Sequence, residues 1–293
     1  MNYTDLATAV TTQLVAQIET GPGTWRMPWH SVPGLFDVRN ASTGNRYRGA
    51  NTVSLALQAI EAEHPTGWWS TYRQWSDLGA QVRKGERSTR IVKWVPAKCN
   101  DAEPTPASSS TDEDQQTLVP RVYSVFNAAQ VDGWTPPAQT APSEIDRDAA
   151  ADAFISNTSA EITYGHNHAA FLPAADRIEL PAAEQFADSE ALYSTTCHEL
   201  THWTGHTSRL NRDLSGRFGD DAYAAEELVA ELGAAIACAH LGIAPTPRDD
   251  HASYLSHWLK ILHADPKALF AVAAKAQTAV DYLDSLQPEE VAA

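Results

Sequence analysis

Residues 195–206 read Thr-Thr-Cys-His-Glu-Leu-Thr-His-Trp-Thr-Gly-His, a stretch that contains the pattern H-E-x-x-H. Residues four positions apart lie on the same face of a helix, so His198 and His202 can direct two imidazole rings at one metal ion. Glu199 lies at the edge of that face, where its carboxylate reaches a metal-bound water rather than the metal. The pattern therefore predicts a helix over residues 190–203 that carries two metal ligands, His198 and His202, and a catalytic base, Glu199.

A catalytic zinc site needs a third protein ligand. The longer pattern H-E-x-x-H-x-x-G-x-x-H would supply it at position 208, but that residue is a serine, Ser208. Residues 222–241 have helical periodicity and offer three glutamates: Glu227 and Glu231 border the apolar face, whereas Glu226 should point into solvent. We expect Glu227 to be the third ligand and Glu231 to hold the other nitrogen of a ligand histidine. The alternatives are an exchange of these two roles, or two exposed helix carboxylates without a ligand.

The expected ligand set of two histidines and one glutamate is typical of zinc, with manganese or cobalt as alternatives. Tyr223, His251 and Tyr254 are candidates for stabilising an oxyanion, although a structural role is the simpler interpretation of each. His166 and His168 precede a predicted strand, where a surface loop is again the simpler interpretation than contact with a substrate.

The net charge of −16 is unevenly distributed along the chain. Residues 1–98 carry a net charge of +4, residues 99–150 carry −7, and residues 151–293 carry −13. A basic segment followed by an acidic one indicates two domains with different functions. We place the boundary in a stretch rich in Pro, Ala and Thr, which gives domains over residues 1–138 and 139–293.

Compartment and membrane contact can also be predicted from the sequence. The three cysteines, Cys99, Cys197 and Cys238, are too widely spaced for a disulfide framework, which favours the reducing cytoplasm. No apolar run approaches the roughly 18–20 residues that span a bilayer, and the first residues lack a signal-peptide pattern. We therefore expect a cytoplasmic protein without membrane contact. Residues 100–117, rich in Ser, Pro and acidic residues, should form a disordered insertion between two strands.

Hydrophobic periodicity predicts an α+β fold in both domains. In the first domain we expect helices over residues 5–20, 51–63 and 70–78, and strands over residues 89–95 and 121–126. In the second domain we expect strands over residues 161–164, 169–172 and 177–180, and helices over residues 146–157, 190–203, 221–241, 251–262 and 266–286.

The first domain interleaves basic residues with six of the nine tryptophans of the chain. This pairing is typical of proteins that bind single-stranded nucleic acid, because cations contact the phosphates while aromatic rings stack on unpaired bases. The alternative is that the tryptophans form the core of the domain, and we expect about half of them to be buried. The residues that we predict to contact nucleic acid are Trp25, Arg46, Tyr47, Arg48, Trp69, Arg73, Trp75, Arg83, Lys84, Arg87 and Lys93.

Taken together, these motifs resemble the ArdC family of antirestriction proteins, which conjugative plasmids and related mobile elements carry. The resemblance covers nearly the whole chain. Its motifs are GTWRMPW, TGNRYRGANTVSL, WWSTYRQWSDLGAQVRKGERSTRIVKW, YSVFNAAQVDGW, CHELTHWTGHTSRLNRDL and YAAEELVAELGAA. The resemblance implies an N-terminal domain that binds single-stranded DNA and a C-terminal domain with a zincin-like, gluzincin-type metalloprotease fold, made of a small sheet and several helices. It also implies that the protein shields incoming DNA from host restriction.

Three functions remain open at this point. The basic domain could coat entering single strands while the acidic, metal-containing domain acts against a host protein such as a restriction enzyme. The protein could instead be a metalloprotease that single-stranded DNA stimulates and that removes other proteins from DNA. Finally, the metal could be structural, and the protein could work by occupying DNA alone. The presence of Glu199 favours chemistry, because a purely structural site needs no general base.

Overall fold

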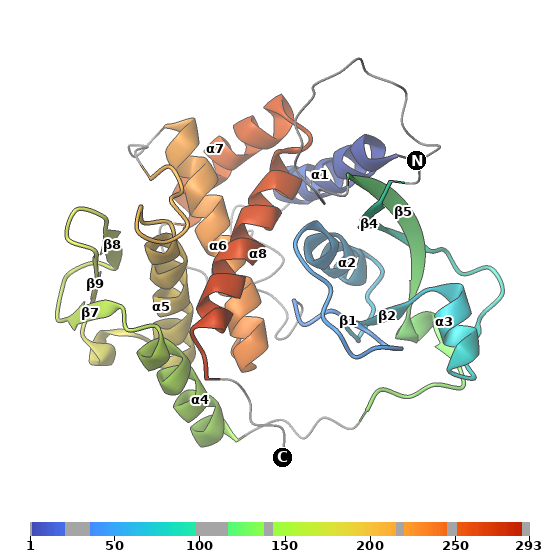
Figure 1. Ribbon diagram of the computed structural model, residues 1–293, viewed down its shortest axis with the longest axis horizontal. Helices are drawn as coiled ribbons and strands as arrows, with labels where there is room; N and C mark the ends of the chain where they lie inside the picture. The colour runs from blue at the N-terminus through green and yellow to red at the C-terminus, as the bar shows by residue number, and fades with distance from the viewer. Residues whose placement is uncertain are drawn as a thin grey trace, which may run out of the picture.

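Figure 1 shows the computed structural model of the protein, which describes residues 2–20, 36–97, 117–137, 143–214, 220–244 and 251–288, and only the backbone of residues 20, 144 and 251–256. Trp25 and the predicted insertion, apart from its last residue, lie outside the described residues. The helices are α1 (Tyr3–Thr20), α2 (Ala50–Glu61), α3 (Tyr72–Asp77), α4 (Glu144–Asn157), α5 (Ser189–Thr204), α6 (Asp221–Leu241), α7 (His251–Ala264) and α8 (Ala268–Ser285). The strands are β1 (Arg39–Asn40), β2 (Trp68–Ser70), β3 (Gln81–Val82), β4 (Thr89–Pro96), β5 (Leu118–Asn127), β6 (Val131–Asp132), β7 (Glu161–Tyr164), β8 (Ala170–Leu172) and β9 (Arg177–Leu180).

The N-terminal domain is built on a four-stranded sheet in the order β1-β2-β5-β4. Strands β4 and β5 form a long antiparallel hairpin in which Thr89 pairs with Val125 and Pro96 pairs with Leu118. Strand β4 is at the edge of this sheet, and the side chain of Asn51 in α2 covers part of that edge. Its Nδ2 donates to the carbonyl of Val92 (2.7 Å), and its Oδ1 accepts from the amide of Val92 (2.8 Å). Helix α2 therefore satisfies backbone groups that an exposed edge would leave unpaired.

The C-terminal domain has a three-stranded sheet in the order β7-β9-β8, with β8 antiparallel to β9. Phe171, Ile178 and Leu180 of this sheet pack with Leu200 and Trp203 of α5. The alternation of strand residues thus fixes α5 against one face of the sheet. Helix α6 lies on the other side of α5, next to α8 (Figure 1).

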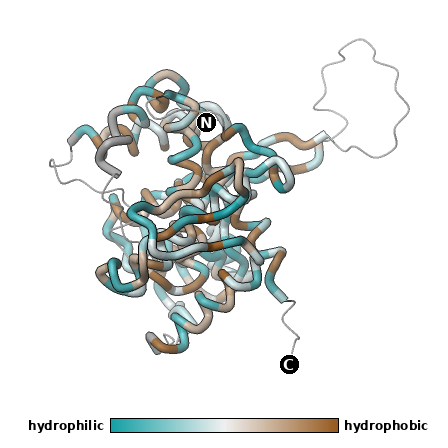
Figure 2. Tube along the Cα trace, turned by 90° about the vertical axis from the view of Figure 1, so that its left-hand side faces the viewer, coloured by the Kyte–Doolittle hydropathy of each residue, from teal (hydrophilic) through white to brown (hydrophobic). Residues whose placement is uncertain are grey.

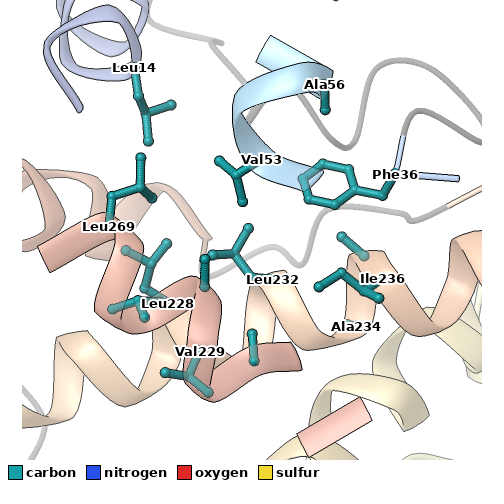
Figure 3. Close-up of a cluster of buried hydrophobic side chains, with 14 of the residues drawn as sticks. Leu14, Phe36, Val53, Ala56, Leu228, Val229, Leu232, Ala234, Ile236 and Leu269 are labelled. Carbon is teal, nitrogen blue, oxygen red and sulfur yellow. The ribbon is translucent and has the colours of Figure 1, made fainter. Parts of the chain in front are cut away.

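Helix α6 also forms part of a core that both domains share. Leu14 of α1, Val53 of α2, Leu232 of α6 and Leu269 of α8 belong to one buried cluster (Figure 3). The mixed helix-and-strand, two-domain class that we predicted is confirmed, but the domains are joined by common apolar packing. The exact domain boundaries stay a prediction.

The distribution of apolar residues fits this compact packing. Hydrophobic and hydrophilic stretches alternate along the whole described chain (Figure 2). None of the helices among the described residues is both long enough and apolar enough to cross a bilayer.

Candidate metal centre and nucleic-acid surface

Helix α5 brings the two histidines of the H-E-x-x-H pattern together. The carboxylate of Asp188 caps its N-terminus by accepting from the amide of Ala191 (2.7 Å), and the helix continues to Thr204. This continuity places His198 and His202 on one face, with their Nε2 atoms 3.2 Å apart. The helical spacing therefore brings the two imidazoles together, as predicted.

Glu227 of α6 completes a triangle with these two imidazoles. Its Oε2 lies 3.4 Å from Nε2 of His198, and its Oε1 lies 3.4 Å from Nε2 of His202. Ligand atoms at about 2.0–2.1 Å from a tetrahedral zinc ion lie about 3.3 Å from one another, so this triangle has the size of one face of such a site. Within the described ranges, these three residues are the only group of His, Cys, Asp or Glu side chains with this convergence. The donor set therefore fits a divalent cation.

Two further glutamates of α6 lie on the outer side of the imidazoles. Oε1 of Glu231 lies 4.0 Å from Nδ1 of His198, near the place that we predicted for it but beyond hydrogen-bond distance. Glu226 contradicts the prediction, because its side chain is only 12% exposed instead of pointing into solvent. Its Oε1 accepts a hydrogen bond from Nδ1 of His202 (3.3 Å) and from the guanidinium of Arg212 (2.8 Å). An isolated helix leaves this face open, whereas residues 205–214 cover it in the folded chain.

The carboxylates around His202 favour a positive charge at its imidazole. Burial lowers the pKa of His202, but hydrogen bonds with Glu226 and Glu227 outweigh burial and raise that pKa to about 10. Burial raises the pKa of Glu227, and hydrogen bonds from His198 and His202 outweigh it and hold that pKa well below its usual range. The carboxylates are thus arranged as counter-charges for a cation.

A cleft of about 280 Å³ opens next to the triangle. Glu199, His202 and Glu227 line it on one side, and Phe171 and Tyr223 are among the residues that line it elsewhere. Oε2 of Glu199 accepts a hydrogen bond from the amide of Phe171 in strand β8 (2.8 Å). The carboxylate expected to act as a base is therefore held at the cleft, beside the ligand set. The side chains of His251 and Tyr254 lie outside the described residues.

His166 and His168 do not line this cleft. Nδ1 of His166 and Nε2 of His168 lie 3.3 Å and 3.5 Å from Oε2 of Glu179, whose other oxygen pairs with Arg177 (2.6 Å). The structure places both histidines in a polar surface cluster, as the simpler interpretation predicted.

The structure corrects the expected aromatic contacts with nucleic acid. Trp69 and Trp75 are 0% exposed, so neither ring can stack on a base in this conformation. Nε1 of Trp75 donates to the carbonyl of Phe126 (3.0 Å), which fixes the ring inside the domain. Tyr47 is partly buried against the cluster that contains Trp69, and burial raises its pKa to about 12. A small domain needs these large rings for its own core.

Several of the expected basic residues form ion pairs within the protein. Nε of Arg46 pairs with Asp37 (2.8 Å), and Arg48 pairs with Asp281 of α8. Arg83 pairs with Glu86 (2.9 Å) and Asp132 (3.4 Å), and Nε of Arg73 lies 3.9 Å from Asp77. The side chains of Lys84, Arg87 and Lys93 are exposed. The role of all these residues in binding nucleic acid stays a prediction.

Sequence reasoning missed a groove of about 560 Å³ on the N-terminal domain, which Tyr72, Gln81, Lys84 and Phe126 help to line. Tyr72 is 53% exposed, and its hydroxyl accepts from Nε2 of Gln81 (3.0 Å). Its ring contacts Phe126 edge to face, with 6.4 Å between centroids. The sequence did contain a signal for this groove, because Tyr72 precedes Arg73 on a predicted helix. The prediction instead took nearby tryptophans as the stacking residues.

Two families match the two domains separately. Residues 4–126 match the family described as the N-terminal domain of anti-restriction factor ArdC, and residues 149–275 match the family described as zincin-like metallopeptidase. The metal-site geometry lies within the second match. The fold of each domain thus agrees with the family that its sequence matches.

Relatives occur both as similar-sized chains and inside longer proteins. The chain is 39% identical over 287 residues to uncharacterized protein y4eC of Sinorhizobium fredii, covering 98% of this chain and 94% of that protein. It is 36% identical over 294 residues to DNA primase TraC of Escherichia coli, covering 96% of this chain but only 27% of the primase. The chain therefore corresponds to a part of TraC.

Solved structures of one relative cover the whole architecture. The metal-free crystal structure of antirestriction protein ArdC from plasmid R388 matches with a TM-score of 0.76 and 34% identity, over 96% of this chain and 97% of that one. The Mn(II)-bound structure of the same protein matches with the same TM-score and identity, over 98% and 99% of the two chains. By sequence, by fold and by near-complete coverage, the chain belongs to the ArdC family of antirestriction proteins.

Proposed function

We propose that this protein binds single-stranded DNA through its N-terminal domain, protects incoming conjugative or mobile DNA from host restriction, and carries a metal-dependent peptidase-like centre. The observation that carries the proposal is the triangle of His198, His202 and Glu227, at the side of a cleft that also contains Glu199. Family membership supports the antirestriction role. The charge difference between the domains supports separate roles, with DNA binding in the basic domain and the metal centre in the acidic one.

The proposed ligands of the cation are Nε2 of His198, Nε2 of His202 and the carboxylate of Glu227. Two imidazoles and one carboxylate suit Zn²⁺, and the Mn(II)-bound relative makes Mn²⁺ the alternative. When bound, such a cation supplies Lewis-acid chemistry and activates water as a nucleophile.

The remaining residues of the cleft would orient the reactants. Glu199 would accept the proton of the nucleophile on its carboxylate, which the amide of Phe171 holds in place. Strand β8 borders the cleft at the edge of its sheet, where an extended polypeptide can lie alongside the strand. These features favour a polypeptide substrate, such as a host restriction enzyme or another protein bound to DNA.

The cleft can be tested with Glu199→Gln and His202→Ala in the full chain. We expect Glu199→Gln to retain the cation and the thermal stability but to lose about 10²–10⁴-fold in any peptide hydrolysis, because only the base is removed. His202→Ala should lose the cation. Metal content, thermal unfolding and protection of an incoming plasmid would be measured side by side.

These variants also separate the alternatives. Plasmid protection that is lost in Glu199→Gln would support chemistry, and cleavage that single-stranded DNA stimulates would favour the DNA-dependent protease. Full plasmid protection by Glu199→Gln, together with loss of folding in His202→Ala, would contradict a catalytic role of the centre. The metal would then be structural, and the protein would act by occupying DNA.

For the DNA contact we propose the groove around Tyr72 in place of the buried tryptophans. Tyr72 offers an exposed ring for stacking, Phe126 supports that ring, and Lys84 with the nearby Arg73 supplies positive charge for phosphates. The bound ligand would be a short single-stranded segment, since stacking on Tyr72 requires an unpaired base.

Tyr72→Ala should weaken binding of a fluorescent single-stranded oligonucleotide by about 1–3 kcal/mol, the usual contribution of one stacked base. Fluorescence anisotropy at fixed salt would measure it, because phosphate contacts depend on salt. Tyr164→Ala is the matched control, since Tyr164 is an equally exposed tyrosine (54%) on the other domain. Equal affinities of the two variants would exclude the groove as the binding site.

A further inference from the structure

Arg212 is a buried arginine that connects the two helices of the candidate metal centre. Its side chain is only 9% exposed, and it follows α5 in the segment that leads toward α6. Its Nη2 and Nε donate to the two oxygens of Glu226, at 2.8 Å and 3.2 Å. A guanidinium that donates two hydrogen bonds to a carboxylate fixes both the position and the orientation of that carboxylate.

The same guanidinium is anchored to α5, the helix that carries His202. Nη2 donates to the carbonyl of Thr201 (2.6 Å), and Nη1 donates to Oγ1 of Thr204 (2.8 Å). Gly205 leaves room for this arrangement, because a Cβ at that position would lie 2.9 Å from Nη2 of Arg212. The sequence thus provides both the arginine and the space that it occupies.

Resting on the cation site proposed above, we infer that Arg212 is a positioning residue that holds Glu226 against Nδ1 of His202. Glu226 accepts the Nδ1 proton of His202 (3.3 Å), which fixes the tautomer whose Nε2 is available to a cation. Removal of Arg212 takes away the other donors of Glu226, and a buried carboxylate without them turns toward water. His202 then loses the contact that orients its ring.

A positioning role and a simple charge effect predict opposite changes in cation affinity when Arg212 is removed. A positive charge close to a cation repels the cation, so removing an arginine that acts only by its charge would strengthen cation binding. Removing an arginine that positions His202 through Glu226 weakens cation binding instead. Loss of a group that orients a metal-bound histidine typically lowers metal affinity about 10- to 100-fold.

Arg209 provides a matched control in the same segment. Its side chain is 8% exposed, it pairs with Asp176 and stacks on Trp203 at 3.9 Å from the ring centroid, and its Nε donates to the carbonyl of Trp203 (2.6 Å). Arg209→Ala therefore removes a buried arginine of similar exposure that does not contact Glu226. Its removal should lower stability but leave the affinity for the cation unchanged.

The experiment measures the Zn²⁺ dissociation constant of the full chain by competition with a chromophoric chelator, together with the unfolding temperature of the metal-free protein. We expect Arg212→Ala and Glu226→Gln each to bind Zn²⁺ about 10- to 100-fold more weakly than the wild type. The double variant should be no weaker than the weaker single variant, because both changes break one connection. Arg212→Lys, which keeps the positive charge but cannot form the bidentate hydrogen bonds with Glu226, should also bind Zn²⁺ weakly.

Several results would overturn the inference. Zn²⁺ binding by Arg212→Ala at or above wild-type affinity, an equal loss in Arg209→Ala, or losses that multiply in the double variant would each do so. If Arg212→Ala does not fold, Arg212→Lys decides, because it keeps the positive charge: binding at wild-type affinity would overturn the inference. A wild-type protein that binds neither Zn²⁺ nor Mn²⁺ would instead contradict the proposed function on which the inference rests.

Discussion

At the scale of single residues, Gly233 sets the distance between α5 and α6. A Cβ at this position would lie 2.5 Å from Cγ2 and 2.6 Å from Oγ1 of Thr201, closer than side-chain atoms approach. Thr201 belongs to the H-E-x-x-H pattern, and Gly233 follows Glu227 on the neighbouring helix. The contact between these two small positions therefore allows the imidazoles of α5 to meet the carboxylate of α6.

Gly233→Ala should lower the free energy of unfolding by about 1–2 kcal/mol, because the overlap with Thr201 outweighs the higher helix propensity of alanine. Chemical denaturation of the metal-free chain would measure this change. Thr201→Ala removes the two closest atoms and leaves only Cβ, at 3.2 Å, so Gly233→Ala should cost clearly less in that background. A similar loss in both backgrounds would show that the close approach of the helices is not the cause.

At the scale of elements, the strongly periodic segments could be predicted from the sequence. The expected strand at residues 89–95 is β4 (Thr89–Pro96), and the expected helix at residues 221–241 is α6 (Asp221–Leu241). Periodicity is reliable there because each element buries one face against a large core. The two-residue strands β1, β3 and β6 could not be predicted, since so short a segment has no period and depends on its partner strand.

The candidate site shows the same limit on local reasoning. His198 and His202 come together through helix geometry alone, so their meeting could be derived from their spacing. Glu226 could not be placed in this way, because its environment depends on Arg212, which reaches it from a segment without regular structure. The expected contacts of Trp69 and Trp75 with bases were wrong for a related reason. Composition does not tell which large rings a small domain buries in its core.

At the scale of the whole molecule, the candidate metal centre and the N-terminal domain share their packing. Helix α6 carries Glu227 toward the cation site, and its Leu232 lies in the same apolar cluster as Val53 of the N-terminal domain (Figure 3). Polar contacts join the domains as well, because the amide of Gly49 donates to Oε1 of Gln277 in α8 (3.0 Å). Exposing this shared apolar surface during separate unfolding of one domain would be costly.

The shared core predicts that a cation bound in the C-terminal domain stabilises the N-terminal sheet. At a free concentration 100 times its dissociation constant, a ligand stabilises the folded state by about 2.7 kcal/mol. If both domains unfold together, the slowest amides of β5 should then exchange hydrogen about 100-fold more slowly with Zn²⁺ than without it.

Hydrogen exchange measured by mass spectrometry would test this coupling, with His198→Ala as the control that cannot complete the ligand set. In that variant Zn²⁺ should leave the exchange of β5 unchanged. Protection that rises in α5 and α6 but not in β5 of the wild type would mean that the domains unfold independently. The apolar cluster between them would then be too weak to transmit the stabilisation, despite the burial of Leu14, Val53 and Leu232 within it.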